Sequence, residues 1–174
     1  MRLTVAALAV SLLAVPALAK SNGAVTVPLK TSTGQDAGTA SFAPKGKAVV
    51  IRLNLKNLPP GQHAVHIHEH AVCEAPDFKT AGGHFNPDSK KHGTENPMGH
   101  HNGDLPQNVT ADANGTAKAT FRVDYLSLDP SASNSLFANG GTSIMVHEKA
   151  DDMKTDPTGN AGNRIACGVI TETK

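Results

Sequence analysis

Four histidines fall within eight residues of this chain, in the stretch HAVHIHEH at residues 63–70. On an extended strand, successive side chains alternate between faces, so His66, His68 and His70 share one face while His63 points to the other. Histidines two residues apart on a strand start roughly 6.5–7 Å apart at Cα, which is close enough for their imidazoles to converge on one ion. The stretch therefore predicts a metal site carried by one face of a β-strand.

Further nitrogen and oxygen donors follow along the chain, with no thiolate among them. Imidazole-rich sites suit zinc and copper, and four nitrogens in a plane favour Cu(II), whereas three histidines and one aspartate in a tetrahedron favour zinc. Seven donors are one too few for two four-ligand sites, so two sites are complete only if one histidine serves both metals. The seven are His66, His68, His84, His92, His101, Asp104 and His147.

The elements that must position these donors are strands, because the apolar residues recur with period two. Turn signals separate the strands, including Asp112-Ala113-Asn114-Gly115 and Pro59-Pro60-Gly61. No long segment shows helical periodicity, so we expect an all-β antiparallel sandwich or barrel. The predicted strands are residues 24–31, 37–43, 47–58, 63–70, 116–123, 142–149 and 165–173.

Two long segments break the strand pattern, residues 71–108 and 149–163, and the first is rich in Gly, Pro, Asn, His and Lys. Loops of this length inside a compact domain usually indicate function or disorder. The first loop also contains His84, His92, His101 and Asp104. A bound metal would supply the ordering energy that such a loop cannot obtain from apolar burial.

The N-terminal residues have the composition of a secretory signal peptide at residues 1–19: one basic residue, an apolar run at 3–15 and a small-residue cleavage site ending at Ala19. The run is too short for a comfortable membrane span, so we expect no stable membrane anchor after cleavage. Residues 20–174 then form one domain. The formal net charge of +1 argues against a nucleic-acid partner. An even count of cysteines in an exported chain predicts one disulfide, with unpaired thiols and a metal-binding pair as the alternatives.

The sequence resembles the copper/zinc superoxide dismutases, in their secreted or periplasmic branch. The stretches that carry the likeness are HAVHIHEHAVCEAPDFKTAGGHFNPDSKKHG, HHNGDLPQNVTADANG, IMVHEKADD and TGNAGNRIACGVI, which cover nearly all of residues 61–170 in order. The resemblance implies an eight-stranded antiparallel Greek-key β-barrel with two long functional loops. It also implies an antioxidant enzyme that disproportionates superoxide to O2 and hydrogen peroxide by cycling Cu(II)/Cu(I) beside a zinc ion.

Carried over residue by residue, the resemblance assigns one copper and one zinc per subunit. Asp151 matches a carboxylate that links a copper-ligand histidine to a zinc-ligand histidine, Arg164 matches the arginine beside the copper, and Cys73 pairs with Cys167. We expect superoxide as substrate, a monomer or homodimer, and a periplasmic location, with secretion as the alternative. The implied ligands are His66, His68, His84 and His147 for copper, and His84, His92, His101 and Asp104 for zinc, with His84 shared.

Several points stay open at this stage. The roles of His63, His70 and His100 are not fixed, and Lys154 is a candidate for attracting the substrate because the loop lacks the paired glutamates of cytosolic members. One alternative function is a module that carries copper or zinc without turnover. Another is a zinc hydrolase, which the HIHEH stretch superficially resembles, although Glu69 would face away from the His66 side.

Overall fold

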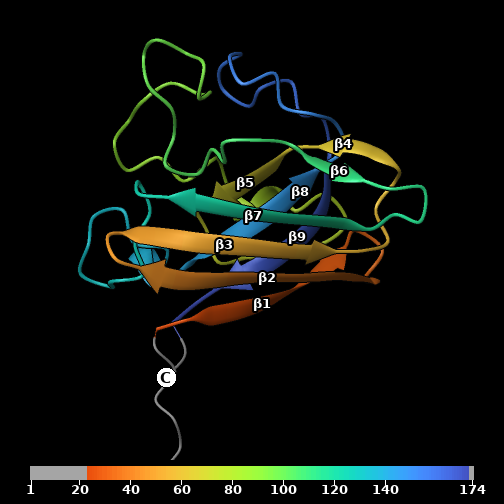
Figure 1. Cartoon of the computed structure of the whole chain (residues 1–174), viewed down its shortest axis with the longest axis horizontal. Coiled ribbons are helices and arrows are strands. Elements are labelled where there is room, and N and C mark those ends of the chain that lie inside the picture. Colours follow the sequence, from red (N-terminus) through yellow and green to blue (C-terminus); the bar gives the residue numbers. More distant parts are fainter. Residues whose placement is uncertain (1–22, 173–174) are drawn as a thin grey trace, which may run out of the picture.

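The computed structural model describes residues 23–172, which form strands and loops with two short 3-10 turns (Figure 1). The predicted signal peptide, residues 1–19, lies outside the described residues. No helix within 23–172 has the length and apolar character needed to cross a bilayer. The strands are β1 (Val25–Thr31), β2 (Asp36–Lys45), β3 (Ala48–Leu55), β4 (Gly61–His63), β5 (Val65–His68), β6 (Val109–Ala111), β7 (Ala117–Val123), β8 (Thr142–His147) and β9 (Arg164–Ile170), and the 3-10 turns are Lys79–Ala81 and Ala138–Gly140.

The strands form a curled antiparallel sheet in the order β5-β8-β9-β1-β2-β3-β7, with β4 and β6 as a separate pair. β4 and β5 are two parts of one strand interrupted at Ala64, whose carbonyl still accepts a hydrogen bond from the His147 amide at 2.9 Å. If β4 and β5 are counted as one strand, the barrel has the eight strands that were expected. The all-β antiparallel class is confirmed. The short β6 was not among the predicted strands, and residues 124–141 form a third irregular stretch that was not predicted.

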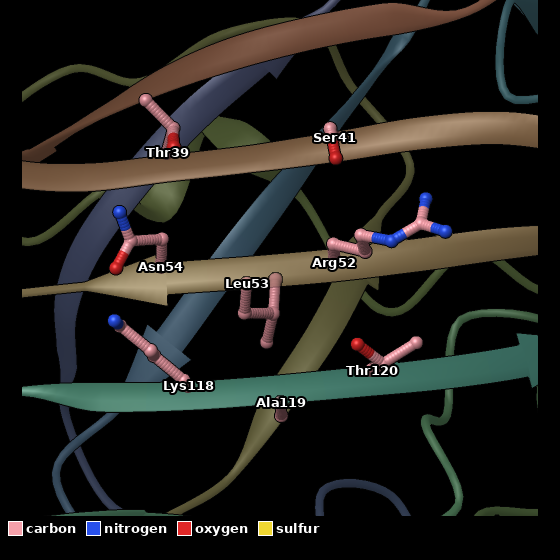
Figure 2. A pocket seen from close by; sticks show the side chains of 8 residues that line it. All are labelled: Thr39, Ser41, Arg52, Leu53, Asn54, Lys118, Ala119 and Thr120. Carbon is pink, nitrogen blue, oxygen red and sulfur yellow. The ribbon is translucent and has the colours of Figure 1, made fainter.

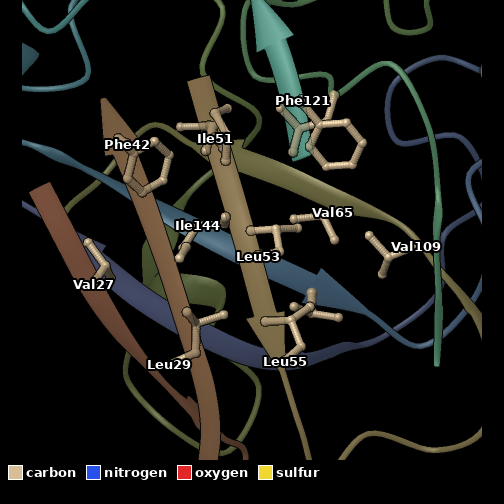
Figure 3. Close-up of a cluster of buried hydrophobic side chains, with 14 of the residues drawn as sticks. Val27, Leu29, Phe42, Ile51, Leu53, Leu55, Val65, Val109, Phe121 and Ile144 are labelled. Atoms are coloured by element: carbon tan, nitrogen blue, oxygen red, sulfur yellow. The ribbon is translucent and has the colours of Figure 1, made fainter. Parts of the chain in front are cut away.

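The apolar side chains of the alternating strands fill the space between two layers. In Figure 1, β1, β2, β3 and β7 form the front layer, and β5, β8 and β9 cross behind them. Because Trp is absent, branched aliphatic residues supply most of this core. Figure 3 shows Phe42, Ile51 and Leu55 from the front layer facing Val65 and Ile144 from the rear.

The same alternation decides where the histidines point. Val65 and Ile67 of β5 lie in the core, so His66 and His68 project from the opposite side of the strand, away from the front layer. On β8, Val146 belongs to the core and His147 therefore projects rearward as well. All three histidines are nevertheless buried, so other parts of the chain cover the rear of the barrel.

Candidate metal centre

Two groups of donor side chains converge behind β5 and β8, and all their members are buried. Within each group the potential ligand atoms lie within 4.8 Å of one another. The first group draws mainly on strands, and the second draws mainly on the loop 71–108. The first group is His66, His68, His84 and His147, and the second is His66, His84, His92 and Asp104.

In the first group, hydrogen bonds to the backbone fix which ring nitrogen is free. His68 Nδ1 lies 3.0 Å from the Gly82 carbonyl oxygen, and His147 Nδ1 lies 3.5 Å from the Gly162 carbonyl oxygen. Since a carbonyl can only accept, each Nδ1 carries the proton and each Nε2 presents a lone pair. These two Nε2 atoms face each other at 3.4 Å. Two facing lone pairs repel unless a cation lies between them.

The other two members of this group present nitrogens without partners. His66 Nε2 lies 2.8 Å from Asp151 Oδ2 and donates to that carboxylate, so His66 Nδ1 is left as a bare acceptor. Both His66 Nδ1 and His84 Nε2 are buried with no hydrogen-bond partner. Buried polar atoms are rarely left unpaired, and four converging imidazole nitrogens are a donor set that suits copper.

At the second group, Asp104 Oδ1 and the Nδ1 atoms of three histidines lie close together. One of these histidines, His101, is an additional neighbour of the group. This oxygen lies 2.8 Å from His84 Nδ1, 3.0 Å from His92 Nδ1 and 3.3 Å from His101 Nδ1, and the Nδ1 atoms of His101 and His84 are 3.3 Å apart. Ligands at zinc bond lengths around a tetrahedral ion lie about 3.3 Å from one another. His101 therefore completes this group better than His66, whose Nε2 is already bound to Asp151.

Burial sets the protonation of the first group. It lowers the pKa of His68 and of His147 well below the usual value. Burial, followed by the proximity of His66, also lowers the pKa of His84 to about 3. These imidazoles are neutral at physiological pH, which is the state that binds a metal.

In the second group, contacts between carboxylates and imidazoles determine the pKa values. Burial would raise the pKa of Asp104, but hydrogen bonds from His101, His84 and His92 outweigh it and hold that pKa far below its usual range. Burial would lower the pKa of His92, but its bonds to Asp104 and Asp151 raise it to about 9. The ionised Asp104 therefore favours a positive charge beside it, which a divalent cation would supply in place of the His92 proton.

Asp151 connects the two groups. Its Oδ2 lies 2.8 Å from His66 Nε2 and its Oδ1 lies 3.0 Å from His92 Nε2. Asn108 holds the Asp151 backbone through reciprocal bonds, because Asn108 Nδ2 donates to the Asp151 carbonyl at 2.9 Å and the Asp151 amide donates to Asn108 Oδ1 at 2.8 Å. No local sequence pattern marks Asn108, since this contact joins residues 43 positions apart.

Arg164 lies at the start of β9, and two backbone carbonyls hold its guanidinium beside the first group. Its Nη1 donates to the Phe78 carbonyl and its Nη2 to the Gly82 carbonyl, both at 2.6 Å. The Gly82 carbonyl also accepts from His68 Nδ1, so one oxygen joins the guanidinium to a histidine of the metal site. Phe78 is buried in a left-handed conformation with φ of 52°. No sequence pattern marked this residue.

The disulfide between Cys73 and Cys167 is present, with Cα atoms 5.7 Å apart, which confirms the prediction from the cysteine count. It lies in a small apolar cluster with Phe78, Ala81 and Met145. The bond therefore fastens the beginning of the loop 71–108 to β9, three residues after Arg164.

The two long loops are also joined to each other, as their adjacent green and blue traces in Figure 1 indicate. Lys91 Nζ lies 3.0 Å from Asp156 Oδ2, and Asp156 Oδ1 accepts from the His92 amide at 2.8 Å. Lys154 Nζ lies 2.9 Å from Glu95 Oε2. Glu95 therefore offsets the charge of Lys154, which weakens the expectation that this lysine attracts an anionic substrate.

The three remaining histidines lie outside both groups. The ring of His63 sits between two carbonyl oxygens, 2.8 Å from that of His147 and 2.7 Å from that of Pro59, so neither nitrogen is free for a metal. His70 is exposed beside Glu69. The ring of His100 packs on Tyr125 with a centroid distance of 4.4 Å.

Comparison with known proteins gives consistent results. Residues 36–170 match the family described as copper/zinc superoxide dismutase (SODC). The chain is 44% identical over 164 residues to Superoxide dismutase [Cu-Zn] 2 of Aquifex aeolicus, covering 94% of this chain and 95% of that protein. It is 42% identical over 147 residues to Superoxide dismutase [Cu-Zn] of Caulobacter vibrioides, covering 83% and 84%.

Among solved structures, the fold is similar to the crystal structure of a SOD-like protein from Bacillus subtilis. The TM-score is 0.78 at 37% sequence identity, and the match covers 83% of this chain and 96% of that one.

Proposed function

The chain belongs to the copper/zinc superoxide dismutase family, and on that premise we propose which of its residues hold each ion and which residue meets the substrate. The enzyme disproportionates superoxide with copper and zinc as cofactors. The proposed copper ligands are His66, His68, His84 and His147. The proposed zinc ligands are His84, His92, His101 and Asp104.

One observation carries this assignment: the two ring nitrogens of His84 face different groups. Its Nδ1 lies 2.8 Å from Asp104 Oδ1 among the zinc donors, and its Nε2 is unpaired among the copper donors. The other histidine found in both groups, His66, has its Nε2 bound to Asp151 and so has one nitrogen left. His84 is therefore the residue that would bind both ions.

When bound, copper supplies the one-electron couple that oxidises one superoxide to O2 and reduces the next to H2O2, while redox-inert zinc supplies fixed positive charge. His84 Nε2 is the atom that would hold and release a proton for the peroxide, because it is buried and has no other partner. Asp104 keeps the opposite nitrogen of that ring in place. Asp151 orients His66 and His92 through their distal nitrogens.

Arg164 is the proposed anion-binding residue. Its guanidinium remains protonated and offers a planar set of N–H donors to a small anion. The Phe78 and Gly82 carbonyls hold it beside the copper donors, so little ordering is required when substrate arrives. Its charge also adds to the field that draws superoxide inward, an effect that salt weakens.

We further propose that residues 1–19 are removed as a signal peptide and that the enzyme works in the periplasm. Its bacterial relatives and its disulfide are compatible with a location outside the cytoplasm, where such bonds persist. Fractionation of cells that produce the full chain, with mass spectrometry of the purified protein, tests this. A cytoplasmic protein that retains residues 1–19 would refute it.

The ligand assignment is tested by measuring superoxide consumption and metal content together. The parent, a His84→Ala variant and a His70→Ala control are loaded with copper and zinc. At equal copper content, we expect His84→Ala to lower kcat/KM by at least about 100-fold, while His70→Ala stays within about twofold of the parent. Undiminished activity of His84→Ala would overturn the role of His84. A fully loaded parent without dismutation would favour a metal-carrying module instead.

A further inference from the structure

Charge is distributed unevenly over this molecule, although its formal net charge is only +1. The segments 25–58 and 117–124, which form the front layer and its connections, contain seven Lys and Arg residues but only Asp36 and Asp124 as acids. The remaining described residues, 59–116 and 125–172, contain six Lys and Arg residues against thirteen Asp and Glu residues. The front layer is therefore strongly basic, and the half that carries the metal site is acidic.

The basic character is concentrated on the outer side of β2, β3 and β7, which is lined with polar side chains (Figure 2). The strand register places them in rows: Thr39 pairs with Asn54, which pairs with Lys118, and in the next row Ser41, Arg52 and Thr120 are neighbours. Arg122 follows Thr120 two residues along β7, on the same side. We call this surface the basic face; it consists of Thr39, Ser41, Arg52, Asn54, Lys118, Thr120 and Arg122.

Within residues 23–172, the cations of the basic face form no ion pair with a carboxylate. At one end Asp36 is bound to Lys56, with Oδ2 and Nζ 2.8 Å apart. At the other end Asp124 lies in a hollow with Lys47 and Arg122. Within residues 23–172, neither Arg52 nor Lys118 takes part in an ion pair.

The reaction does not account for this charge. The basic face lies on the outside of the front layer, whereas His66, His68 and His147 project from the rear of β5 and β8 beyond the core. Charges that are separated by more than about 8 Å of solvent are largely screened at physiological salt. Positive charge on the front layer therefore contributes little to drawing superoxide to the metals.

We propose that the basic face binds an acidic polysaccharide, a glycan chain that carries carboxylate, sulfate or phosphate groups. Lys118 and Arg122 are about 13 Å apart along β7, and Arg52 lies across from Thr120 midway between them, so the cations can meet charges that recur along a linear polymer. The hydroxyls of Thr39 and Ser41 can bond to sugar hydroxyls. The metal site then faces away from the polymer.

A lipid surface fits this face less well. Peripheral proteins commonly add an apolar anchor to a basic patch. The exposed large hydrophobic side chains of the described chain are Val72, Met98 and Val169, and none belongs to the basic face.

The test uses the metal-loaded enzyme with dextran sulfate as the acidic glycan and neutral dextran as its control. Binding is measured by calorimetry at 50 mM and 200 mM salt. The face variant combines Arg52→Ser, Lys118→Ser and Arg122→Ser. A matched variant removes the same charge elsewhere, through Lys79→Ser, Lys90→Ser and Lys149→Ser. Vesicles with anionic phospholipid are run in parallel.

We expect dextran sulfate to bind and dextran not to bind. The face variant should raise the Kd at least about tenfold and flatten its salt dependence, because counterion release scales with the number of cations in contact. The matched variant should change the Kd less than about threefold. No binding to dextran sulfate at 50 mM salt, or equal losses in both variants, would overturn the proposal. Tighter binding to vesicles that the face variant abolishes would replace the glycan with a lipid surface.

Discussion

The two metal groups are built from different kinds of structure. On the copper side, His66 and His68 come from β5 and His147 from β8, so the sheet ladder places three of the four proposed ligands. On the zinc side, all four proposed ligands lie in the loop 71–108, whose regular structure in this region is one 3-10 turn at Lys79–Ala81. We therefore expect the sheet to hold its histidines without an ion, and the loop to depend on its hydrogen bonds and on the ion.

In the loop, hydrogen bonds to the Asp104 carboxylate do what the sheet ladder does for the copper side, because they hold the backbone in place. Beyond its contacts with imidazoles, its Oδ2 accepts from the Gly93 amide at 2.9 Å and from the His101 amide at 3.0 Å. A single carboxylate thus fixes both the backbone and the ligands of the zinc side. The disulfide fixes the other end of the same loop, near Arg164.

The largest expected effect comes from removing that disulfide. A Cys73→Ser, Cys167→Ser double variant opens a bond between residues 94 positions apart. The chain-entropy model predicts a loss of roughly 4–5 kcal/mol in the free energy of unfolding, as an upper estimate. Urea denaturation of the metal-loaded proteins measures it. A loss below about 1 kcal/mol would mean that the apolar cluster around Phe78 holds the loop without the bond.

Asp104→Ala should have the next largest effect, and it should affect the zinc side more than the copper side. We expect zinc affinity to fall at least about 100-fold, because a ligand and two backbone contacts are lost together, while copper affinity changes less than about tenfold. Residues 84–104 should become sensitive to protease. Competition with chelators measures both affinities, with the exposed Asp88→Ala as control. Equal losses of both metals would contradict independent support of the copper side by the sheet.

Asp151→Asn should weaken both sides, because its two oxygens contact His66 and His92 separately. Losing such an outer carboxylate typically costs about 10–100-fold in metal affinity. The neighbouring Asp152→Asn is the matched control, since the Asp152 carboxylate bonds to its own loop at the Lys154 and Thr155 amides. A change for only one metal would show that Asp151 does not couple the two groups.

Arg164→Lys should have the smallest effect, a loss of about tenfold in kcat/KM for superoxide with metal content unchanged. A lysine keeps the charge but cannot contact the Phe78 and Gly82 carbonyls as a fork. Arg52→Lys, on the basic face, is the control and should leave kcat/KM unchanged. A wild-type rate for Arg164→Lys would mean that charge alone suffices and that orientation adds nothing.

The parts of the molecule that follow strand periodicity could be predicted from the sequence. Alternation placed His66 and His68 on one side of a strand, and burial of Val65 and Ile67 explains why the structure has them there. The strand break at Ala64 and the three-residue β6 were missed, because segments that short show no period.

The loops could not be derived in the same way. Their ligands were assigned by resemblance to a family, since nothing in the spacing of His84, His92 and His101 places them around one point. Two sets of contacts join residues far apart in sequence: those of Asn108 with Asp151, and the hydrogen bond from Arg164 to the Phe78 carbonyl. Such contacts depend on the completed fold, and no local pattern encodes them.

In the proposed metal centre one imidazole, that of His84, joins the copper and zinc sides. The most direct test loads copper into the copper side and paramagnetic cobalt into the zinc side and records the Cu(II) electron paramagnetic resonance signal. A bridging imidazolate would couple the two spins, so we expect a copper signal that is strongly reduced in the parent and restored in His84→Ala at equal metal content. A full-strength copper signal in the doubly loaded parent would contradict it.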